Sequence, residues 1–183
     1  MVKEPRVGRV KTRLGRDMGM VAAAHWYRRQ TAHALRRLQS PHWNLLMAVD
    51  TGTSTLTEAI WPLHIGRVPQ GGGNLGDRMG RIFRSLPPGP VCIIGSDIPE
   101  ISTNHIHFAF KELGTHEAVI GPAIDGGFWL IGFKRLRRIP YALFANVRWS
   151  TEHAMADTLA GIHWISVKRI ATLSDVDVAS DIN

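Results

Sequence analysis

An aspartate, Asp97, follows a short apolar run in the stretch V-C-I-I-G-S-D-I-P, which extends from Val91 to Pro99. Four apolar residues in a row predict a strand covered on both faces, as in a parallel sheet, and the glycine and Ser96 after them predict a turn. Ligands of open α/β sheets lie beyond the carboxyl ends of the strands. A carboxylate there is placed to hold a divalent metal against a phosphate, although Asp is also a common turn or helix-cap residue.

A second acidic pair lies near the end of the chain, where Asp175 and Asp177 are separated by one residue. In an extended segment, residues two apart point to the same side. Two carboxylates on one side require a cation or solvent between them. The pair is therefore a further candidate for cation binding, whereas Asp181 is expected to cap or begin a terminal helix.

The first sixteen residues are rich in Lys and Arg and contain Gly8. The glycine allows a tight loop whose backbone N–H groups approach a phosphate, with Lys11 and Arg13 supplying positive charge. The G-K-[ST] ending of a Walker loop is absent. A solvated basic arm or a weak nucleic-acid binder is the alternative, but the aromatic residues on which single-stranded nucleic acids stack are missing here.

The segment Q-G-G-G-N-L-G-D-R-M, from Gln70 to Met79, joins consecutive glycines to a predicted helix. Asn74 is a typical N-cap, and the apolar residues after it keep helical spacing. A glycine loop that feeds a helix lets a planar base or a phosphate come close to the backbone. Gln70 carries the donors and the acceptor needed to read a base edge. A flexible linker is the alternative explanation of the glycines.

Another carboxylate, Asp125, precedes Gly126 and Gly127 in the run G-P-A-I-D-G-G-F-W-L-I-G. The two glycines permit a turn that other residues do not enter easily. Phe128 and Trp129 follow as candidate walls of a pocket. We interpret the segment as a substrate loop, with a tight hairpin corner as the alternative.

These residues need elements to position them, and the apolar periodicity predicts alternating helices and strands. Helices are expected over residues 20–39, 74–83, 102–113 and 150–161. Ser150, which follows Trp149, is the expected cap of the last helix. Strands are expected over residues 45–49, 91–94, 118–121, 128–133 and 162–167. The threonine-rich stretch 51–62 gives no clear pattern.

The chain has 183 residues, 44% hydrophobic and 20% charged, which predicts one globular domain over residues 1–183. The single cysteine, Cys92, lies in an apolar strand, which excludes an internal disulfide and suits a reducing cytoplasm. The N-terminus lacks the apolar region of a secretory signal, and no apolar run is long enough for a membrane span. The formal net charge of +7 favours anionic partners such as nucleotide phosphates, nucleic acid or a membrane surface.

Six motifs occur in one order along the chain. The first is K-x-P-x-x-G-x-V-K-T-R-L, from Lys3 to Leu14, and it is followed by the glycine segment, G-S-D-I-P, the hairpin segment, W-S-T and D-V-D. Together they resemble an uncharacterised bacterial glycosyltransferase-like family of GT-A fold, often described as nucleotide-diphospho-sugar transferases. The plan is similar to that of 2-phospholactate guanylyltransferase and the molybdenum-cofactor guanylyltransferases. The resemblance covers nearly the whole chain.

The resemblance implies a Rossmann-like, three-layer α/β fold with a mixed, mostly parallel sheet, whose first strand would be truncated before Lys3. A nucleotide would be bound by Lys3, Gly8, Lys11, Arg13, Gln70, Gly73 and Ser96. A Mg²⁺ or Mn²⁺ ion would be held by Asp97 with Asp175 or Asp177. Catalytic roles would fall to Asp97, Lys11, Arg13 and Asp125. The acceptor would face Gly126, Gly127, Phe128, Trp129 and Trp149.

The leading hypothesis is a cytoplasmic, metal-dependent transferase that uses a nucleotide or nucleotide-sugar donor and an acceptor that the sequence does not name. Cations aimed at the leaving phosphates would lower the barrier to such a transfer. A nucleotidyltransferase that releases pyrophosphate is a rival on the same fold. A non-catalytic basic binding protein is a rival of another class, although nucleic acid is not the expected partner.

Overall fold

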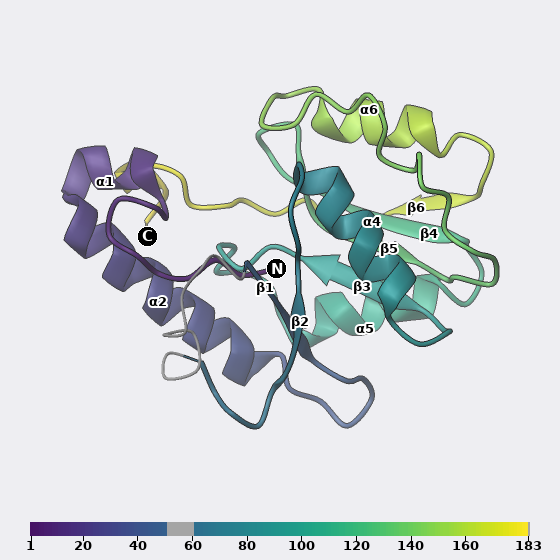
Figure 1. Cartoon of the computed structure of the whole chain (residues 1–183), viewed down its shortest axis with the longest axis horizontal. Helices are drawn as coiled ribbons and strands as arrows, with labels where there is room; N and C mark the ends of the chain where they lie inside the picture. Colours follow the sequence, from purple (N-terminus) through teal and green to yellow (C-terminus); the bar gives the residue numbers. More distant parts are fainter. Residues whose placement is uncertain (51–60, 183) are drawn as a thin grey trace. The chain divides into compact units, whose positions relative to one another are not determined.

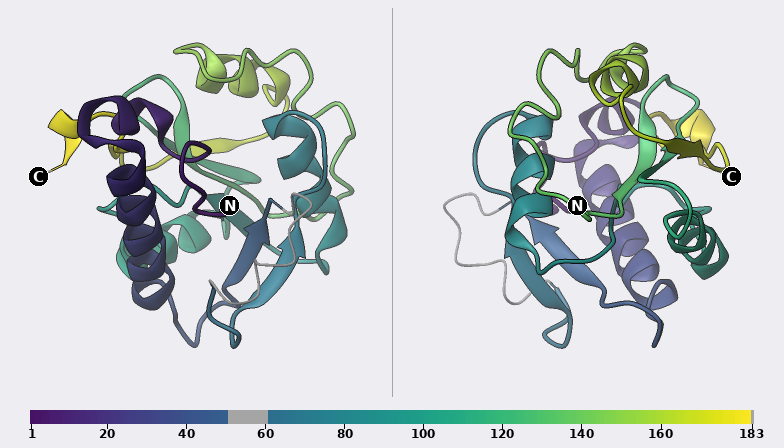
Figure 2. Two further views of the ribbon diagram at one scale, coloured as in Figure 1. Left: turned by 60° about the vertical axis from the view of Figure 1, so that its left-hand side comes forward. Right: turned by 90° about the vertical axis from the view of Figure 1, so that its right-hand side faces the viewer.

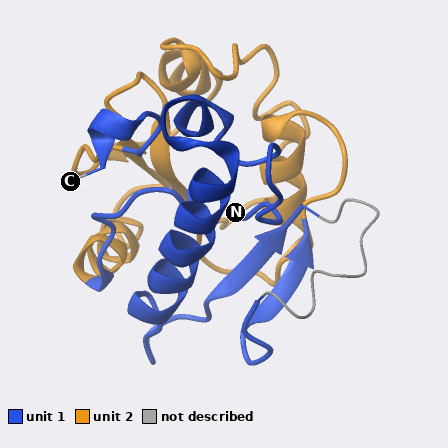
Figure 3. Cartoon of the chain, turned by 90° about the vertical axis from the view of Figure 1, so that its left-hand side faces the viewer, with its two compact units in different colours: residues 1–69, 95–103, 175–183 blue, residues 70–94, 104–174 orange. Residues whose placement is uncertain are grey.

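The computed structural model describes residues 1–50 and 61–182, and the chain divides into two compact units (Figure 3). Unit 1 comprises residues 1–69, 95–103 and 175–183, and unit 2 comprises residues 70–94 and 104–174. Most of the threonine-rich stretch 51–62, in which no pattern could be recognised, lies outside the described residues.

Unit 1 combines two helices with a pair of parallel strands. The two strands lie side by side in Figure 2. The helices are α1, Thr12–Met18, and α2, Met20–Arg37. The strands are β1, Leu46–Val49, and β2, Gly66–Pro69. A 3₁₀ turn, η1, spans Ala179–Asp181 and lies beside α1 in Figure 1.

The helix expected over residues 20–39 is confirmed by α2. Its buried residues follow one another in steps of one, three or four, whereas its arginines are exposed, so one face supplies apolar contacts and the other meets solvent. Leu35 of this face belongs to the largest described cluster of unit 1. The other buried members of that cluster are Val2, Met47, Val49, Trp61 and Ile65.

The segment before Lys3 lies beside β1. Val2 forms a parallel bridge with Val49, its N–H donates to the Ala48 carbonyl at 2.8 Å, and the Asp50 N–H donates to the Val2 carbonyl at 3.1 Å. Paired in this way, Val2 anchors the start of the basic segment, which continues through Lys3 towards α1.

Unit 2 contains a sheet with the strand order β3-β5-β4-β6. Its strands are β3, Val91–Ile94; β4, Ala118–Pro122; β5, Phe128–Phe133; and β6, Val167–Arg169. Its helices are α4, Leu75–Ser85; α5, Thr103–Glu112; and α6, Ala154–Gly161. The first residue of α5, Thr103, is assigned to unit 1 and the rest of the helix to unit 2.

The α/β class and the mixed pairing of strands are confirmed, but the sheet is not mostly parallel. Both β3 and β4 pair antiparallel with β5, whereas β4 pairs parallel with β6 and β1 with β2. The prediction that β3 is a parallel strand covered on both faces is also wrong, because β3 pairs antiparallel with β5 and three of its four residues keep some solvent exposure. A short apolar run does not distinguish parallel from antiparallel pairing.

Burial raises the pKa of the Cys92 thiol in β3 to about 12, so the thiol stays protonated near neutral pH.

The predicted start of α4 is confirmed by a reciprocal cap. The Asp77 N–H donates to Asn74 Oδ1, and the Asn74 N–H donates to Asp77 Oδ2, both at 3.0 Å. The predicted cap at Ser150 is wrong, because this residue has φ 62° and α6 begins only at Ala154. The last strand also begins later than expected, at Val167. In the part of the chain that the structure describes, no helix has the length and apolar character to cross a membrane.

Candidate metal centre

Three aspartates from distant parts of the sequence meet in unit 1. Asp97 lies in the loop after β3, and Asp175 and Asp177 lie in the C-terminal segment. One carboxylate oxygen from each lies within 4.8 Å of the other two, and all three side chains are half-buried. A backbone hydrogen bond of 3.3 Å from the Val176 N–H to the Asp97 carbonyl joins the two segments at this point. The predicted orientation of Asp175 and Asp177 to one side is consistent with this cluster.

Lys11 reaches into the acidic cluster. Its Nζ lies 2.5 Å from Asp97 Oδ2 and 2.8 Å from Asp177 Oδ1, and only 8% of its side chain is exposed. Burial alone lowers the pKa of Lys11, but the nearby Asp97 and Asp177 carboxylates outweigh it and raise the pKa above its usual value. Lys11 is therefore a fixed positive charge between two of the three carboxylates.

The backbone places Lys11 by an unusual conformation. Lys11 has φ 44° and ψ 50° and immediately precedes α1, so its side chain enters the cluster from a left-handed turn. Gly8, which precedes Lys11 by three residues, has φ 75° and lies in the predicted tight loop. Sequence reasoning missed α1, although Gly19 marks its end, and it missed the conformation of Lys11, because no glycine stands at that position.

Arg13 adds a second positive charge at the edge of the cluster. Its Nη1 donates to Asp177 Oδ2 at 3.0 Å, while 67% of its side chain remains exposed. With three carboxylates and two cationic side chains, the cluster keeps a formal charge of −1 when all five groups are ionised. A further cation is therefore attracted to it, and the exposed Arg13 remains accessible to an anion.

Tyr27 of α2 fixes two of the predicted nucleotide-binding residues. Its hydroxyl accepts a hydrogen bond from the Lys3 N–H at 2.9 Å and lies 3.1 Å from Ser96 Oγ. Burial raises the pKa of Tyr27. The sequence places Tyr27 on the apolar face of α2, which predicts only a core residue. A buried hydroxyl needs a hydrogen-bond partner, and this requirement could have indicated the role of Tyr27. The side chain of Lys3 itself is exposed.

The C-terminal segment that carries Asp177 is held by two more carboxylates. Asp181 Oδ2 accepts hydrogen bonds of 2.9 Å from the N–H groups of Asp177 and Val178, and these bonds lower the pKa of Asp181. Asp17 Oδ2 accepts from the Ala179 N–H at 3.0 Å and so joins the segment to α1. Asp181 therefore caps η1, which agrees with its predicted place at a terminal helix.

The donor set of this cluster fits a hard divalent cation. Carboxylate oxygens are the ligands that Mg²⁺ and Mn²⁺ prefer, and carboxylate oxygens are what Asp97, Asp175 and Asp177 offer. Lys11 in contact with two of them shows that the cluster already stabilises one positive charge.

In unit 2, Asp125 closes the corner between β4 and β5. Its Oδ1 accepts a hydrogen bond of 2.9 Å from the Gly127 N–H, and its side chain is exposed. Gly126 has φ 85°, and a Cβ there would lie 2.3 Å from the Glu152 carbonyl oxygen. The hairpin-corner alternative thus describes this segment, and a role for Asp125 or the two glycines toward an acceptor stays a prediction.

Trp129 belongs to the core of unit 2 and is not the pocket wall that the sequence suggested. It is 1% exposed, and its indole N–H donates to the Ala171 carbonyl at 2.8 Å. Alternation along β5 turns Trp129 inwards, and its large ring fills the interior. Phe128 is half-buried and contacts Trp149, with ring centroids 6.2 Å apart.

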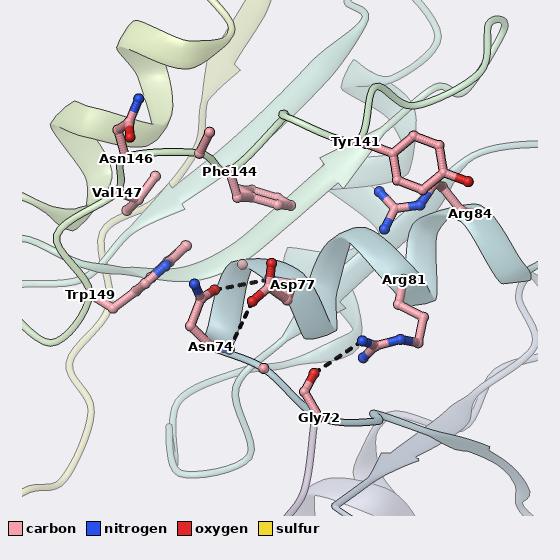
Figure 4. A pocket seen from close by; sticks show the side chains of 13 residues that line it. Gly72, Asn74, Asp77, Arg81, Arg84, Tyr141, Phe144, Asn146, Val147 and Trp149 are labelled. Atoms are coloured by element: carbon pink, nitrogen blue, oxygen red, sulfur yellow. Dashed lines mark hydrogen bonds between the residues drawn. The ribbon is translucent and has the colours of Figure 1, made fainter.

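The glycine segment also lies in unit 2. Gln70 is 3% exposed, so its side chain does not present an exposed base-reading edge, and its main-chain carbonyl accepts a hydrogen bond from Arg81. Gly73 and Trp149 line a pocket of about 410 Å³ (Figure 4). Of the predicted site residues in unit 2, Gly73 and Trp149 therefore line this pocket, whereas Asp97, Asp175, Asp177, Lys11 and Arg13 meet at the acidic cluster of unit 1.

Comparisons with known proteins agree with this fold. The family described as "Uncharacterized protein conserved in bacteria (DUF2064)" matches residues 31–151. A solved structure from Desulfovibrio desulfuricans G20, described as a "putative nucleotide-diphospho-sugar transferase", is 31% identical with a TM-score of 0.87, covering 97% of this chain and 80% of that one. A 4-diphosphocytidyl-2C-methyl-D-erythritol synthase from Anaerococcus prevotii DSM 20548 is 11% identical with a TM-score of 0.60, over 85% of this chain and 82% of that one, which shows a shared fold alone.

Among curated proteins, none matches the chain. The family match covers more than half of the sequence, and the Desulfovibrio structure shares its fold over nearly all of it. The chain therefore belongs to the bacterial family DUF2064 and resembles nucleotide-diphospho-sugar transferases of GT-A-like fold.

Proposed function

We propose that this protein is a metal-dependent transferase that acts on a nucleotide or nucleotide-sugar donor. The observation that carries the proposal is the meeting of Asp97, Asp175 and Asp177 around Lys11 in unit 1. The likeness to the Desulfovibrio structure supports the donor class. Neither the carboxylate cluster nor the fold names the acceptor.

In this proposal the three aspartates hold Mg²⁺ or Mn²⁺. The bound ion supplies positive charge to the leaving phosphates, where negative charge builds up during transfer. Lys11 and Arg13 donate hydrogen bonds to the same phosphates. Arg13 is exposed enough to do so, and the raised pKa of Lys11 keeps that side chain protonated at neutral pH.

Lys11 has a further part in this scheme, because it holds the carboxylates together before any donor binds. Its ammonium group contacts Asp97 and Asp177, whose oxygens would otherwise repel one another at short range. If a divalent cation occupied those oxygens, the three N–H donors of Lys11 would be available to phosphate oxygens. The ammonium group of Lys11 would then stabilise the phosphates of the donor in place of the carboxylates.

Tyr27 acts as a positioning residue for the same site. It joins the main chain at Lys3 to the side chain of Ser96, directly before Asp97. Because Ser96 and Asp97 are neighbours in one loop, loss of the hydroxyl should loosen the loop that carries the carboxylate.

A nucleotidyltransferase remains the second candidate on this fold. The reaction products decide between the two candidates, because a nucleotidyltransferase releases pyrophosphate and a glycosyltransferase releases a nucleoside phosphate. The acidic cluster serves either reaction, since both develop negative charge on phosphate oxygens.

The test is a thermal-shift screen of nucleoside triphosphates and nucleotide sugars, each with and without MgCl₂ or MnCl₂. We expect one or more nucleotides to raise the Tm only when the metal is present. Asp97→Asn should abolish that metal-dependent shift. Glu100→Gln, which changes an exposed carboxylate a few residues further along the same unit, should leave the shift unchanged.

Two outcomes would count against the proposal. One is a nucleotide shift that is equally large without metal or in the Asp97→Asn variant. The other is the absence of any nucleotide shift together with binding of nucleic acid that weakens steeply with salt, which would favour the basic binding protein.

A further inference from the structure

Unit 2 contains a pocket that the metal centre does not use. It has a volume of about 410 Å³ and lies between the start of α4 and the segment 141–149 (Figure 4). Ligand pockets in proteins have volumes of roughly 300 to 1,000 Å³, so this one suits a small molecule. Arg81, Arg84 and Asp77 contribute charge to its lining, with a formal sum of +1.

Two glycines of α4 make room for the groups that line the pocket. A Cβ at Gly76 would lie 2.6 Å from Phe144 Cβ and 2.8 Å from Trp149 Cζ2, and a Cβ at Gly80 would lie 3.0 Å from Arg84 Nη1. Glycine inside a helix is destabilising relative to alanine. The glycines of this helix therefore allow the aromatic wall and the guanidinium group to approach its backbone closely.

Arg84 is the charged group best placed to receive an anion. Its guanidinium carbon lies 4.4 Å from the centroid of the Tyr141 ring, so the ring covers one face of the group. Stacking leaves the N–H groups, which lie in the guanidinium plane, available for hydrogen bonds. Nη1 is shielded from solvent and has no hydrogen-bond partner among the described residues. A buried charged donor without a partner is unfavourable, and an anion that pairs with the guanidinium group from the pocket would offset its positive charge.

Two other charged groups that line the pocket, Arg81 and Asp77, are engaged in hydrogen bonds. Arg81 donates from Nη1 to the Gln70 carbonyl and from Nη2 to the Gly72 carbonyl, so it holds the glycine segment in place. At the start of α4, the Asn74 side chain accepts from the Asp77 N–H and the Asp77 carboxylate accepts from the Asn74 N–H. The Asp77 carboxylate at this helix N-terminus disfavours an anion there, so recognition of an anion falls to Arg84.

The opposite wall of the pocket is aromatic. The rings of Phe144 and Trp149 lie with centroids 6.0 Å apart, and Trp149 is half-buried. Figure 4 shows Trp149 and Arg84 at opposite sides of the pocket, with Phe144 between them. A half-exposed indole offers a flat apolar face, which suits a planar ring more than a chain of hydroxyls.

We propose that this pocket binds a small molecule that carries a phosphate or carboxylate beside a planar ring. The anion pairs with Arg84, and the ring packs on Trp149. Use of this molecule as the acceptor rests on the proposed function, but its binding does not. The binding needs no divalent cation, because no aspartate of the metal centre lines the pocket.

The test is a titration of the full-length protein with phenyl phosphate and with benzoate in the absence of divalent metal. Calorimetry and tryptophan fluorescence measure the binding. We expect at least one of these two probes to bind at least tenfold more tightly than both inorganic phosphate and phenol, which each lack one half of the recognised group. The preference between the two probes distinguishes a phosphate ligand from a carboxylate ligand. Trp149→Phe should abolish most of the fluorescence change.

Two arginines next to the same tyrosine provide a matched comparison. Arg84→Met should weaken binding of the preferred probe at least tenfold, and Arg84→Lys, which keeps the charge, should weaken it less. Arg138→Met is the control, because Arg138 also lies over the Tyr141 ring, at 5.7 Å, but does not line the pocket. It should bind the probe as the unmodified protein does.

The proposal is overturned if neither probe binds at millimolar concentration, if both bind no better than inorganic phosphate or phenol, or if Arg84→Met weakens binding no more than Arg138→Met does. Asp97→Asn separates this proposal from the transferase proposal, since it should keep probe binding while losing the metal-dependent nucleotide shift. The absence of a metal-dependent nucleotide shift in the unmodified protein would count against the transferase proposal and not against the pocket proposal.

Discussion

The ammonium group of Lys11 lies 2.5 Å from the carboxylate of Asp97, which connects the loop before α1 to the loop after β3. The same ammonium group contacts Asp177 in the C-terminal segment. Three stretches that are far apart in the sequence are therefore tied together by one side chain. Because unlike charges hold them there, the arrangement depends on the charge of Lys11 as much as on packing.

Lys11→Met should destabilise the protein and make its stability depend on magnesium. The substitution leaves the carboxylates of Asp97 and Asp177, which are 28% and 35% exposed, without their shared cation. We expect a loss of about 1–3 kcal/mol, below that of a fully buried pair because solvent screens both acids. A divalent cation should restore more stability to this variant than to the unmodified protein. Urea unfolding with and without MgCl₂ measures both effects, with the exposed Lys3→Met as control.

Equal stability of Lys11→Met and the unmodified protein would contradict this account of the centre. It would mean that the three carboxylates gain nothing from the lysine. A loss of stability that MgCl₂ does not reverse would instead leave the lysine as a structural ion-pair partner and remove support for the metal.

Tyr27→Phe should loosen the loop that carries Asp97. The change removes the acceptor of the Lys3 N–H and the partner of Ser96 Oγ while keeping the ring. One buried donor left without a partner costs about 1–3 kcal/mol. Thermal unfolding of Tyr27→Phe, Ser96→Ala and the double variant forms a cycle. If the two single effects add without any coupling, the contact between the hydroxyls does not stabilise the loop.

The local parts of the fold could be predicted from the sequence. The amphipathic spacing of α2, the cap of α4 at Asn74 and the apolar run of β5 each follow from interactions within one segment. Strand pairing could not be predicted in the same way. The apolar residues of β3 fit parallel and antiparallel neighbours alike, and only the complete fold decides between them.

The candidate site shows the same division. The predicted side-by-side orientation of Asp175 and Asp177 needs only an extended segment, and their oxygens do cluster. Their approach to Asp97 depends on contacts between distant segments, so spacing alone could not predict it. The glycine turn before Trp129 predicts a place for this residue at a pocket wall. In the structure, alternation along β5 turns Trp129 into the core.

Gly126→Ala should destabilise the protein more than Gly8→Ala, although both glycines have positive φ. A Cβ at Gly126 would lie 2.3 Å from the Glu152 carbonyl oxygen, whereas one at Gly8 meets nothing within 4 Å. Left-handed strain alone costs about 1–2 kcal/mol, which is the expected effect at Gly8. The steric overlap should add at least as much again at Gly126, because backbone atoms must move. Chemical denaturation of the two variants tests this order, and equal losses would show that the corner yields easily.

Asp157→Asn should lower the Tm at neutral pH and should lose this effect in acid. The Asp157 carboxylate accepts three hydrogen bonds of 2.8 to 3.0 Å from Arg148, and these bonds hold its pKa well below the usual value of 3.8. A lowered pKa in the folded protein means that the stabilisation is present above pH 3.8 and is lost as the pH falls towards the folded value. The two Tm curves should therefore separate above pH 4 and converge below it. Glu152→Gln, at an exposed position in the same unit, serves as the control, and a constant difference at every pH would show that the contact does not depend on charge.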